Sequence, residues 1–249
     1  MRRSCLVLAA VGIVATAGLA AAQPGDLTLS PLAHAIACSP PPSLDAAPPE
    51  ALRIIGSQDT TPRALFGDRD LLVIGGGTAA GVQLGQQFFI RRTMTFGGNQ
   101  VSRGAKTLGW LRVVAVNEST AIARVDEVCG GIILDDYLVP FVPPEIPAAA
   151  ESNDMIGQPD FATLGHIVVG NEDRSTLGAG EFALIDWGKA EGVVPGARFA
   201  IYRNVGANGL PLVSVGEGVV ISMGANLALT RVTRARDAVF SGDLVAFRR

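Results

Sequence analysis

Most of this chain consists of short segments in which apolar and polar residues alternate. Leu111–Val116 and Ala121–Val125 follow the period of two that is typical of a strand with one buried face, and Asn117–Thr120 between them has the composition of a hairpin turn. Gly218–Ser222 and Leu227–Val232 repeat this arrangement. The strands follow one another at spacings of about 10 to 15 residues without a convincing amphipathic helix, which favours an all-β fold of small barrels.

An internal repeat underlies this pattern. Six positions of its first half recur 111 residues later: Gly77, Gly81, Gly85, Phe88, Ile90 and Arg92 return as Gly188, Gly192, Gly196, Phe199, Ile201 and Arg203. Five positions of its second half recur 107 residues later: Gly109, Ala121, Val125, Ile132 and Asp136 return as Gly216, Ala228, Val232, Val239 and Asp243. The sequence therefore predicts two tandem modules of one fold. Because glycine adopts positive φ without a steric cost, matching structural turns are expected at four glycines: Gly81, Gly85, Gly192 and Gly196.

The N-terminus has the three parts of a secretory signal. Arg2 and Arg3 precede the apolar run Leu6–Leu19, and Ala20–Ala22 supplies small residues for cleavage. The run is too short and too rich in alanine and glycine for a membrane-spanning helix. Proline-rich segments then separate the modules. The predicted organisation is a signal peptide at 1–22, a Pro-rich leader at 23–52, the first module at 53–141, a Pro/Ala linker at 142–163 and the second module at 164–249.

Cysteine usage agrees with export. Cys5 would leave with the signal, so the mature chain keeps Cys38 and Cys129, and an even pair in an oxidising compartment favours a disulfide. Two alternatives remain open at this point. Both thiols can be free, or Cys38 can carry a lipid, since Ala35–Ala37 before it resembles part of a lipobox.

Composition and motif counts argue against several kinds of chemistry. The formal net charge of −3 does not favour nucleic acid or an anionic membrane surface. After the signal, no apolar run is long enough to form a transmembrane segment. With His34 and His166 as the only histidines, a histidine-based zinc site or a Ser-His-Asp triad has too few parts, and we expect no metal. Asp136 and Asp243 each precede the last strand of a module and are expected to bond their own turn backbone.

A glycine-rich segment in the first module resembles a dinucleotide-binding fingerprint. Gly75, Gly77 and Ala80 have the GxGxxA spacing after an apolar strand. That fingerprint requires a helix directly afterwards and an acidic residue about 20 positions on. Gly85 interrupts the expected helix and 96–99 carries no acidic residue, so we expect no cofactor.

The repeated pattern carries a resemblance to a known group of modules. Its elements are Gly-x3-Gly-x3-Gly-x2-Phe-x-Ile-x-Arg, a Gly-led strand, a hairpin ending in Ala-x3-Val, and a closing aspartate. It resembles the small SH3-like β-barrel module that accompanies LysM domains in bacterial envelope proteins, and it is similar to the C-terminal domain of the flagellar assembly protein T. The likeness covers about 53–141 and 164–247. It implies SH3-like barrels in a non-enzymatic envelope component, without the LysM segment that would bring peptidoglycan binding.

The function expected from these observations is that of an exported, non-catalytic protein of the periplasm or cell envelope, acting as a structural or binding module. Its partner would be an envelope protein or peptidoglycan. A glycine-containing loop at 93–107 carries Phe96, Arg103 and Lys106 and is the expected binding tip, although it fits a solvated hairpin without a partner equally well. Two alternatives are a nucleotide-cofactor oxidoreductase that uses 75–81 and an envelope glycan hydrolase that uses paired carboxylates.

Overall fold

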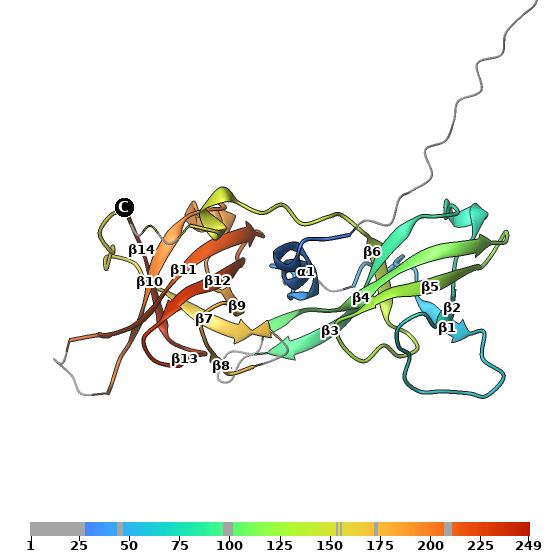
Figure 1. The fold of residues 1–249 in the computed structure, drawn as a ribbon, viewed down its shortest axis with the longest axis horizontal. Coiled ribbons are helices and arrows are strands. Elements are labelled where there is room, and N and C mark those ends of the chain that lie inside the picture. The colour runs from blue at the N-terminus through green and yellow to red at the C-terminus, as the bar shows by residue number, and fades with distance from the viewer. Residues whose placement is uncertain are drawn as a thin grey trace, which may run out of the picture.

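The computed structural model describes residues 28–43, 47–96, 102–152, 154, 156–171, 174–206 and 211–249. The expected signal peptide lies outside these ranges. The described residues fold mainly into β-strands, arranged as two units side by side with an α-helix, α1 (Pro31–Cys38), between them (Figure 1). The expectation of an all-β fold is confirmed at this level.

The first unit is a six-stranded antiparallel sheet, which we call the first sheet. Its strands are β1 (Ile54–Ser57), β2 (Leu71–Ile74), β3 (Gln87–Phe96), β4 (Ser102–Val116), β5 (Ala121–Val128) and β6 (Tyr137–Pro140). Their order is β1-β2-β5-β4-β3-β6. A bridge between Arg53 and Tyr137 brings the two edges of the sheet together.

The second unit is a closed barrel with the same strand order. Its strands are β7 (Gly165–Gly170), β9 (Phe182–Ile185), β10 (Arg198–Arg203), β11 (Val213–Met223), β12 (Ala228–Ala235) and β14 (Leu244–Phe247). Two further short strands pair with each other: β8 (Thr176–Leu177) and β13 (Val239–Phe240). In the first unit, an isolated bridge between Phe66 and Ile132 corresponds to this pair of strands.

Short 3-10 helices lie at equivalent places in the two units. These are η1 (Thr78–Ala80) and η4 (Lys189–Glu191), and each ends at a left-handed glycine, Gly81 or Gly192, with φ of 77°. Gly85 and Gly196 follow with φ of 80° and 86°. Another 3-10 helix, η2 (Ala148–Ala150), lies in the linker. The pattern of repeated glycines therefore corresponds to a repeated path of the backbone.

Alternation along the strands separates two inner cores from two outer clusters. Ile74, Leu111 and Val125 lie inside the first sheet, and the matching Ile185 and Val232 lie inside the barrel. Side chains that point outward from the barrel form a third cluster, and some of those from the first sheet form a fourth. Both outer clusters include residues of α1.

The helix α1 is thus shared by the two units. Ile36 packs with Val219 and Leu229 on the outside of the barrel. Ala37 packs with Phe89 and Trp110 on the outside of the first sheet. Burial on both sides explains why an eight-residue helix, too short to be stable alone, is retained here.

The segment 93–107, expected to be either a binding loop or a solvated hairpin, consists largely of paired strand residues. Thr93 pairs with Ala105 and Met94 with Gly104 as β3 and β4 continue outward as a ribbon. We call the paired residues 93–96 and 102–105 the arm. Met94 packs against the outer cluster of the barrel, so the arm reaches the second unit.

Candidate functional site

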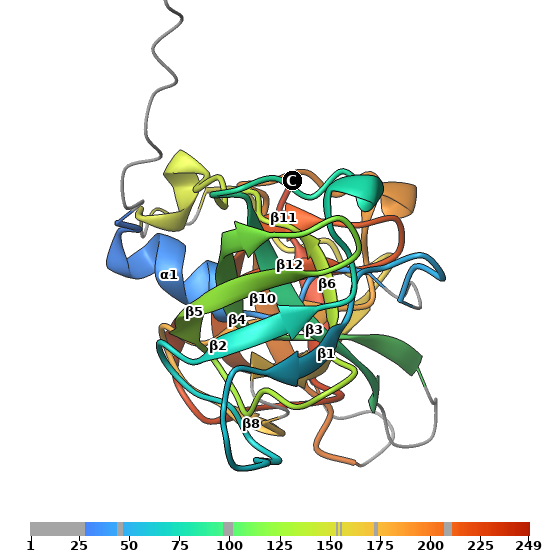
Figure 2. The same cartoon turned by 90° about the vertical axis from the view of Figure 1, so that its right-hand side faces the viewer.

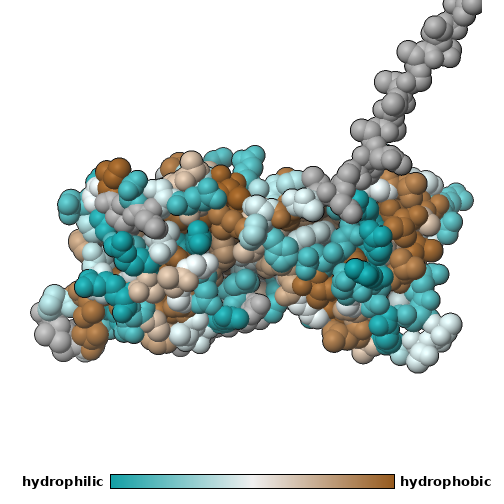
Figure 3. Space-filling model, viewed as in Figure 1, coloured by the Kyte–Doolittle hydropathy of each residue, from teal (hydrophilic) through white to brown (hydrophobic). Residues whose placement is uncertain are grey.

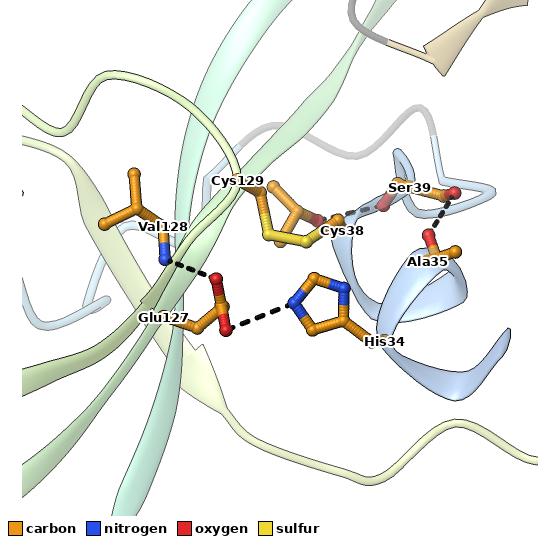
Figure 4. The surroundings of a disulfide bond; sticks show 8 residues. His34, Ala35, Cys38, Ser39, Glu127, Val128 and Cys129 are labelled. Carbon is orange, nitrogen blue, oxygen red and sulfur yellow. Dashed lines mark hydrogen bonds and ion pairs between the residues drawn. A yellow bond between two sulfur atoms is a disulfide. The ribbon is translucent and has the colours of Figure 1, made fainter. Parts of the chain in front are cut away.

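A disulfide fixes α1 to the first sheet (Figure 4). Cys38, the last residue of the helix, is bonded to Cys129, which directly follows β5, and their Cα atoms are 5.4 Å apart. The predicted disulfide is confirmed, which excludes the free-thiol and lipid alternatives for this state of the protein. Such a bond is typical of chains from oxidising compartments.

Local hydrogen bonds define both ends of the helix. The Ser30 hydroxyl oxygen accepts from the Ala33 amide at 3.2 Å, and Pro31 occupies the first turn, where its missing N–H is not needed. At the other end, Ser39 Oγ donates to the Ala35 carbonyl at 2.8 Å. Thr107 Oγ1 on β4 donates to the Ser39 carbonyl at 3.0 Å, which joins the helix end to the sheet.

One polar side chain of α1 also reaches the sheet. His34 Nε2 lies 3.1 Å from Glu127 Oε2, and the second carboxylate oxygen of Glu127 accepts from the Val128 amide (Figure 4). The imidazole meets the Trp110 ring edge-on, with ring centroids 5.5 Å apart. The helix is therefore held by a covalent bond, a polar pair and an aromatic contact within two turns.

A cleft of about 820 Å³ opens beside this contact. The segment before α1 forms one wall, and the outer surface of β3, β4 and β5 forms the floor. Its lining includes side chains of both charge signs together with polar and apolar ones. The described lining residues are Thr28, Leu29, His34, Asp68, Arg69, Gln87, Trp110, Arg112, Arg124, Val125, Asp126 and Glu127. A surface of this kind suits a polar ligand that offers both donors and acceptors.

Asp126 organises the floor of the cleft. Its carboxylate accepts from Arg112 Nε at 2.9 Å and from Arg124 Nη2 at 3.0 Å. Gln87 Nε2 donates to the same carboxylate at 3.4 Å. Residues from three adjacent strands are thereby aligned across the sheet, with the Arg124 side chain still 45% exposed.

A second group of ionisable residues lies on the outside of the first sheet at β3 and β6. The Arg91 guanidinium lies over the Phe89 ring, 5.2 Å from its centroid. Burial lowers the pKa of Arg91 and raises the pKa of the neighbouring Tyr137 phenol. Both shifts disfavour the charged form, as expected for desolvated groups.

The aspartates before the last strands take part in a repeated ion pair. Arg92 donates to both carboxylate oxygens of Asp136, with Nε at 2.7 Å and Nη2 at 2.8 Å. Arg203 and Asp243 form the same pair at 2.8 Å and 2.7 Å. Each aspartate also accepts from a backbone amide of its own turn, Asp136 from that of Ile133. Each carboxylate therefore bonds within its own unit.

The structure describes the predicted binding residues only in part. Phe96 and Arg103 are on the paired strands of the arm, and their side chains are not among those that the structure describes. Lys106 is half-buried on β4, opposite Arg92. Lys106 does not belong to the described lining of the cleft. The cleft residues were missed because their grouping depends on pairing between β3, β4 and β5.

The glycine-rich segment at 75–81 is a structural turn. It leads into η1 and, after the turn at Gly85, into β3, where the fingerprint requires a helix. A side chain at Gly77 would place its Cβ 2.1 Å from the Asn117 carbonyl oxygen. Close approach of this turn to the β4–β5 hairpin therefore accounts for glycine at this position.

Other candidate chemistry is limited within the described part of the chain. No group of three or more His, Cys, Asp or Glu side chains is positioned to hold a metal ion there. His166 Nδ1 pairs with Asp186 at 2.8 Å on an exposed surface of the barrel. In these same residues, no helix has the length and apolar character needed to cross a membrane.

Known proteins give no further guide to this site, since neither a family model nor a curated protein sequence matches the chain.

Proposed function

We propose that this chain is an exported protein of the cell envelope that has no catalytic role and binds a partner through the cleft beside α1. The disulfide between Cys38 and Cys129 supports a location in an oxidising compartment. Under this proposal the two units are small binding modules, and α1 and the arm hold them together.

The observation that carries the proposal is the way the cleft is built. A covalently anchored helix and three sheet strands fix its walls, so little conformational freedom would be lost when a ligand binds. Its floor offers donors of Gln87, Arg112 and Arg124 that are aligned by one carboxylate. Preorganised polar groups of this kind favour recognition of a specific partner.

The lining residues favour binding over the enzymatic alternatives. Among the lining residues that the structure describes, Thr28 carries the only hydroxyl group and no thiol is present, which leaves His34 and Glu127 without a strong nucleophile to activate there. Asp68, Asp126 and Glu127 are the carboxylates, and Asp126 already accepts from two arginines. Glu127 pairs with His34. Asp68 is largely exposed, with its carboxylate 3.5 Å from Arg69 Nε, and is the least closely paired of the three, whereas a glycan hydrolase uses two carboxyl groups.

Site-specific crosslinking in the native envelope tests this proposal. A photoreactive residue placed at Asp68, on the rim of the cleft, is expected to give a defined adduct. The same photoreactive residue, placed instead at the exposed barrel position Arg234, is the matched control. Mass spectrometry before and after muramidase treatment distinguishes a protein partner from peptidoglycan. Equal labelling from both positions, or glycan release by the purified protein, would contradict the proposal.

A further inference from the structure

The two units differ in what covers the same outer face. In the barrel, outward side chains of β9, β11 and β12 form an apolar layer that includes Phe182, Val219 and Leu229. Ala150 of η2 and Ile36 of α1 pack on this layer and are 2% and 6% exposed. The chain thus covers this face of the barrel with its own linker and helix.

Two arginines of the barrel hold the linker by its main chain. Arg198 Nη2 donates to the carbonyls of Ala149 and Ser152, both at 2.9 Å. Arg231 Nη1 donates to the Ala150 carbonyl at 3.0 Å. The face therefore binds a short alanine-rich segment through its carbonyl oxygens, with small side chains packed on the sheet.

The spacing of the repeat identifies the equivalent face on the first sheet. Phe182, Val219 and Arg231 correspond by the offsets of 111 and 107 residues to Leu71, Arg112 and Arg124. Strand pairing supports this correspondence. In the barrel, Arg231 lies opposite both Phe182 and Val219. In the first sheet, Arg124 lies opposite both Leu71 and Arg112. Arg198 likewise corresponds to Gln87, which lies opposite Arg112. We call Leu71, Gln87, Arg112, Val114 and Arg124 the open face.

The open face is exposed where its counterpart is buried. Leu71 is 42% exposed and Val114 39%, whereas the matching Phe182 and Ile221 are 4% and 2% exposed. In Figure 2, β2 and β5 cross the front of the molecule, and α1 lies to one side of them. Figure 3 shows brown, hydrophobic surface gathered at the end of the molecule formed by the first sheet.

We infer that the open face is a docking surface for a short alanine-rich segment of a partner protein, bound as the linker is bound to the barrel. Gln87, Arg112 and Arg124 supply the donors for its main-chain carbonyls, in place of Arg198 and Arg231. Small apolar side chains of the segment pack on Leu71 and Val114. Arg112, which replaces Val219, pairs with Asp126, and Arg69 at the rim lies beside Asp68, so the surroundings of the open face offer both charge signs to polar residues that flank the segment. This inference rests on the proposed function and names the class of partner.

The linker itself supplies the probe. A fluorescein-labelled peptide with the sequence Glu-Ile-Pro-Ala-Ala-Ala-Glu-Ser, which is residues 145–152, is titrated with mature protein in fluorescence anisotropy. Saturable binding is expected, and the R124L substitution should weaken it at least tenfold. R234L, on the equivalent strand of the barrel but away from the covered face, should leave it unchanged. Circular dichroism and melting temperatures verify that both variants fold.

Several outcomes would overturn the inference. Absence of saturable binding, or equal binding by wild type and R124L, removes the open face as the site. Binding that appears only after residues 23–27 are deleted shows that the chain's own N-terminal segment is the occupant. Loss of a dimer in R124L by light scattering shows that the occupant is a second copy. If crosslinking from Asp68 still captures a partner in any of these cases, the proposed function stands and only this inference fails.

Discussion

Glycine is needed at repeated positions for two different reasons. A Cβ at Gly77 or Gly188 would lie 2.1 Å or 2.7 Å from a carbonyl oxygen of the neighbouring hairpin. Gly81 and Gly192 have open space around them, but both have φ of 77°, which L-residues adopt at a cost. The first pair is therefore required by packing and the second by backbone conformation.

This difference predicts unequal effects of alanine. Gly81→Ala should lower the free energy of unfolding by about 1 kcal/mol, the usual cost of a left-handed non-glycine residue. Gly77→Ala should lower it by about 3 kcal/mol, because a backbone clash forces the hairpin to move. Urea denaturation of the two variants measures both values. Equal effects would show that the two turns do not approach each other as described.

Removal of one charge from the repeated ion pair should destabilise either unit similarly. Asp136→Asn and Asp243→Asn each weaken two charge-assisted hydrogen bonds, and each should cost about 2 kcal/mol of stability. Asp68→Asn, at an exposed position, is the control and should change stability by less than about 0.5 kcal/mol. A small effect at Asp136 with a large one at Asp243 would indicate that the pairs are not equivalent.

Burial of Tyr137 predicts a dependence of stability on alkaline pH. Because burial raises the pKa of this phenol in the folded state, the unfolded chain ionises first as the pH rises. The stabilising contribution is present below the unfolded pKa of about 10 and is lost above it. The fall in melting temperature between pH 8 and pH 10.5 should be smaller in Tyr137→Phe than in wild type, and equal falls in the two proteins would contradict the prediction.

Sequence spacing predicts these residues unequally well. Positions such as Gly81 and Gly192 stand out because turn conformation is a local requirement. Arg92 and Asp136 also recur in the second half, as Arg203 and Asp243, but the two members of each pair belong to blocks with different offsets. Their contact depends on strands that meet only after the sheet closes. The same limit applies to Arg112 and Arg124, whose shared carboxylate is apparent only from strand pairing.

At the scale of elements, short or unusual segments were the hardest to predict. The strands of the hairpin at 111–125 follow from their alternation. Helix α1 does not, because Pro31–Cys38 is mostly apolar on every side and is stabilised by tertiary burial. Ser30 followed by Pro31 was the available signal for its start. The arm was interpreted as a loop because its glycines suggested turns, yet its residues pair as strands.

The disulfide should contribute strongly to the stability of α1. The sequence separation of Cys38 and Cys129 is 91, and a loop of this size corresponds to about 4 kcal/mol in the chain-entropy model. Cys129→Ser should therefore lower the melting temperature. In this variant, hydrogen exchange should show that the amides of Ala35–Ala37 lose their protection. The amides of the barrel core around Val220 should keep theirs. Unchanged protection would mean that packing alone holds the helix.

At the scale of the whole molecule, three segments join the first sheet to the barrel. Helix α1 packs on both, the arm places Met94 on the outer cluster of the barrel, and η2 covers part of the same cluster. The outer clusters bury apolar side chains that neither unit covers alone. The two units are therefore expected to behave as one body in solution.

Calorimetry tests this coupling. Oxidised protein should unfold in one transition with equal calorimetric and van't Hoff enthalpies, as a cooperative unit does. Under reducing conditions the transition should separate into two, since α1 is no longer fixed to the first sheet by a covalent bond. Two transitions in the oxidised state would show that the first sheet and the barrel fold independently.

The position of α1 has a consequence for the order in which the chain folds as it emerges from a ribosome or a translocation channel. The helix leaves first, but Cys38 can reach Cys129 only after the strands of the first sheet have appeared. Ile36 can pack against Leu229 only later still, after the strands of the barrel have appeared. Contacts between residues so distant in sequence form slowly. Until synthesis is nearly complete, the apolar side chains and the Cys38 thiol of the N-terminal segment thus stay exposed, and an oxidant, a chaperone or a protease has access to them.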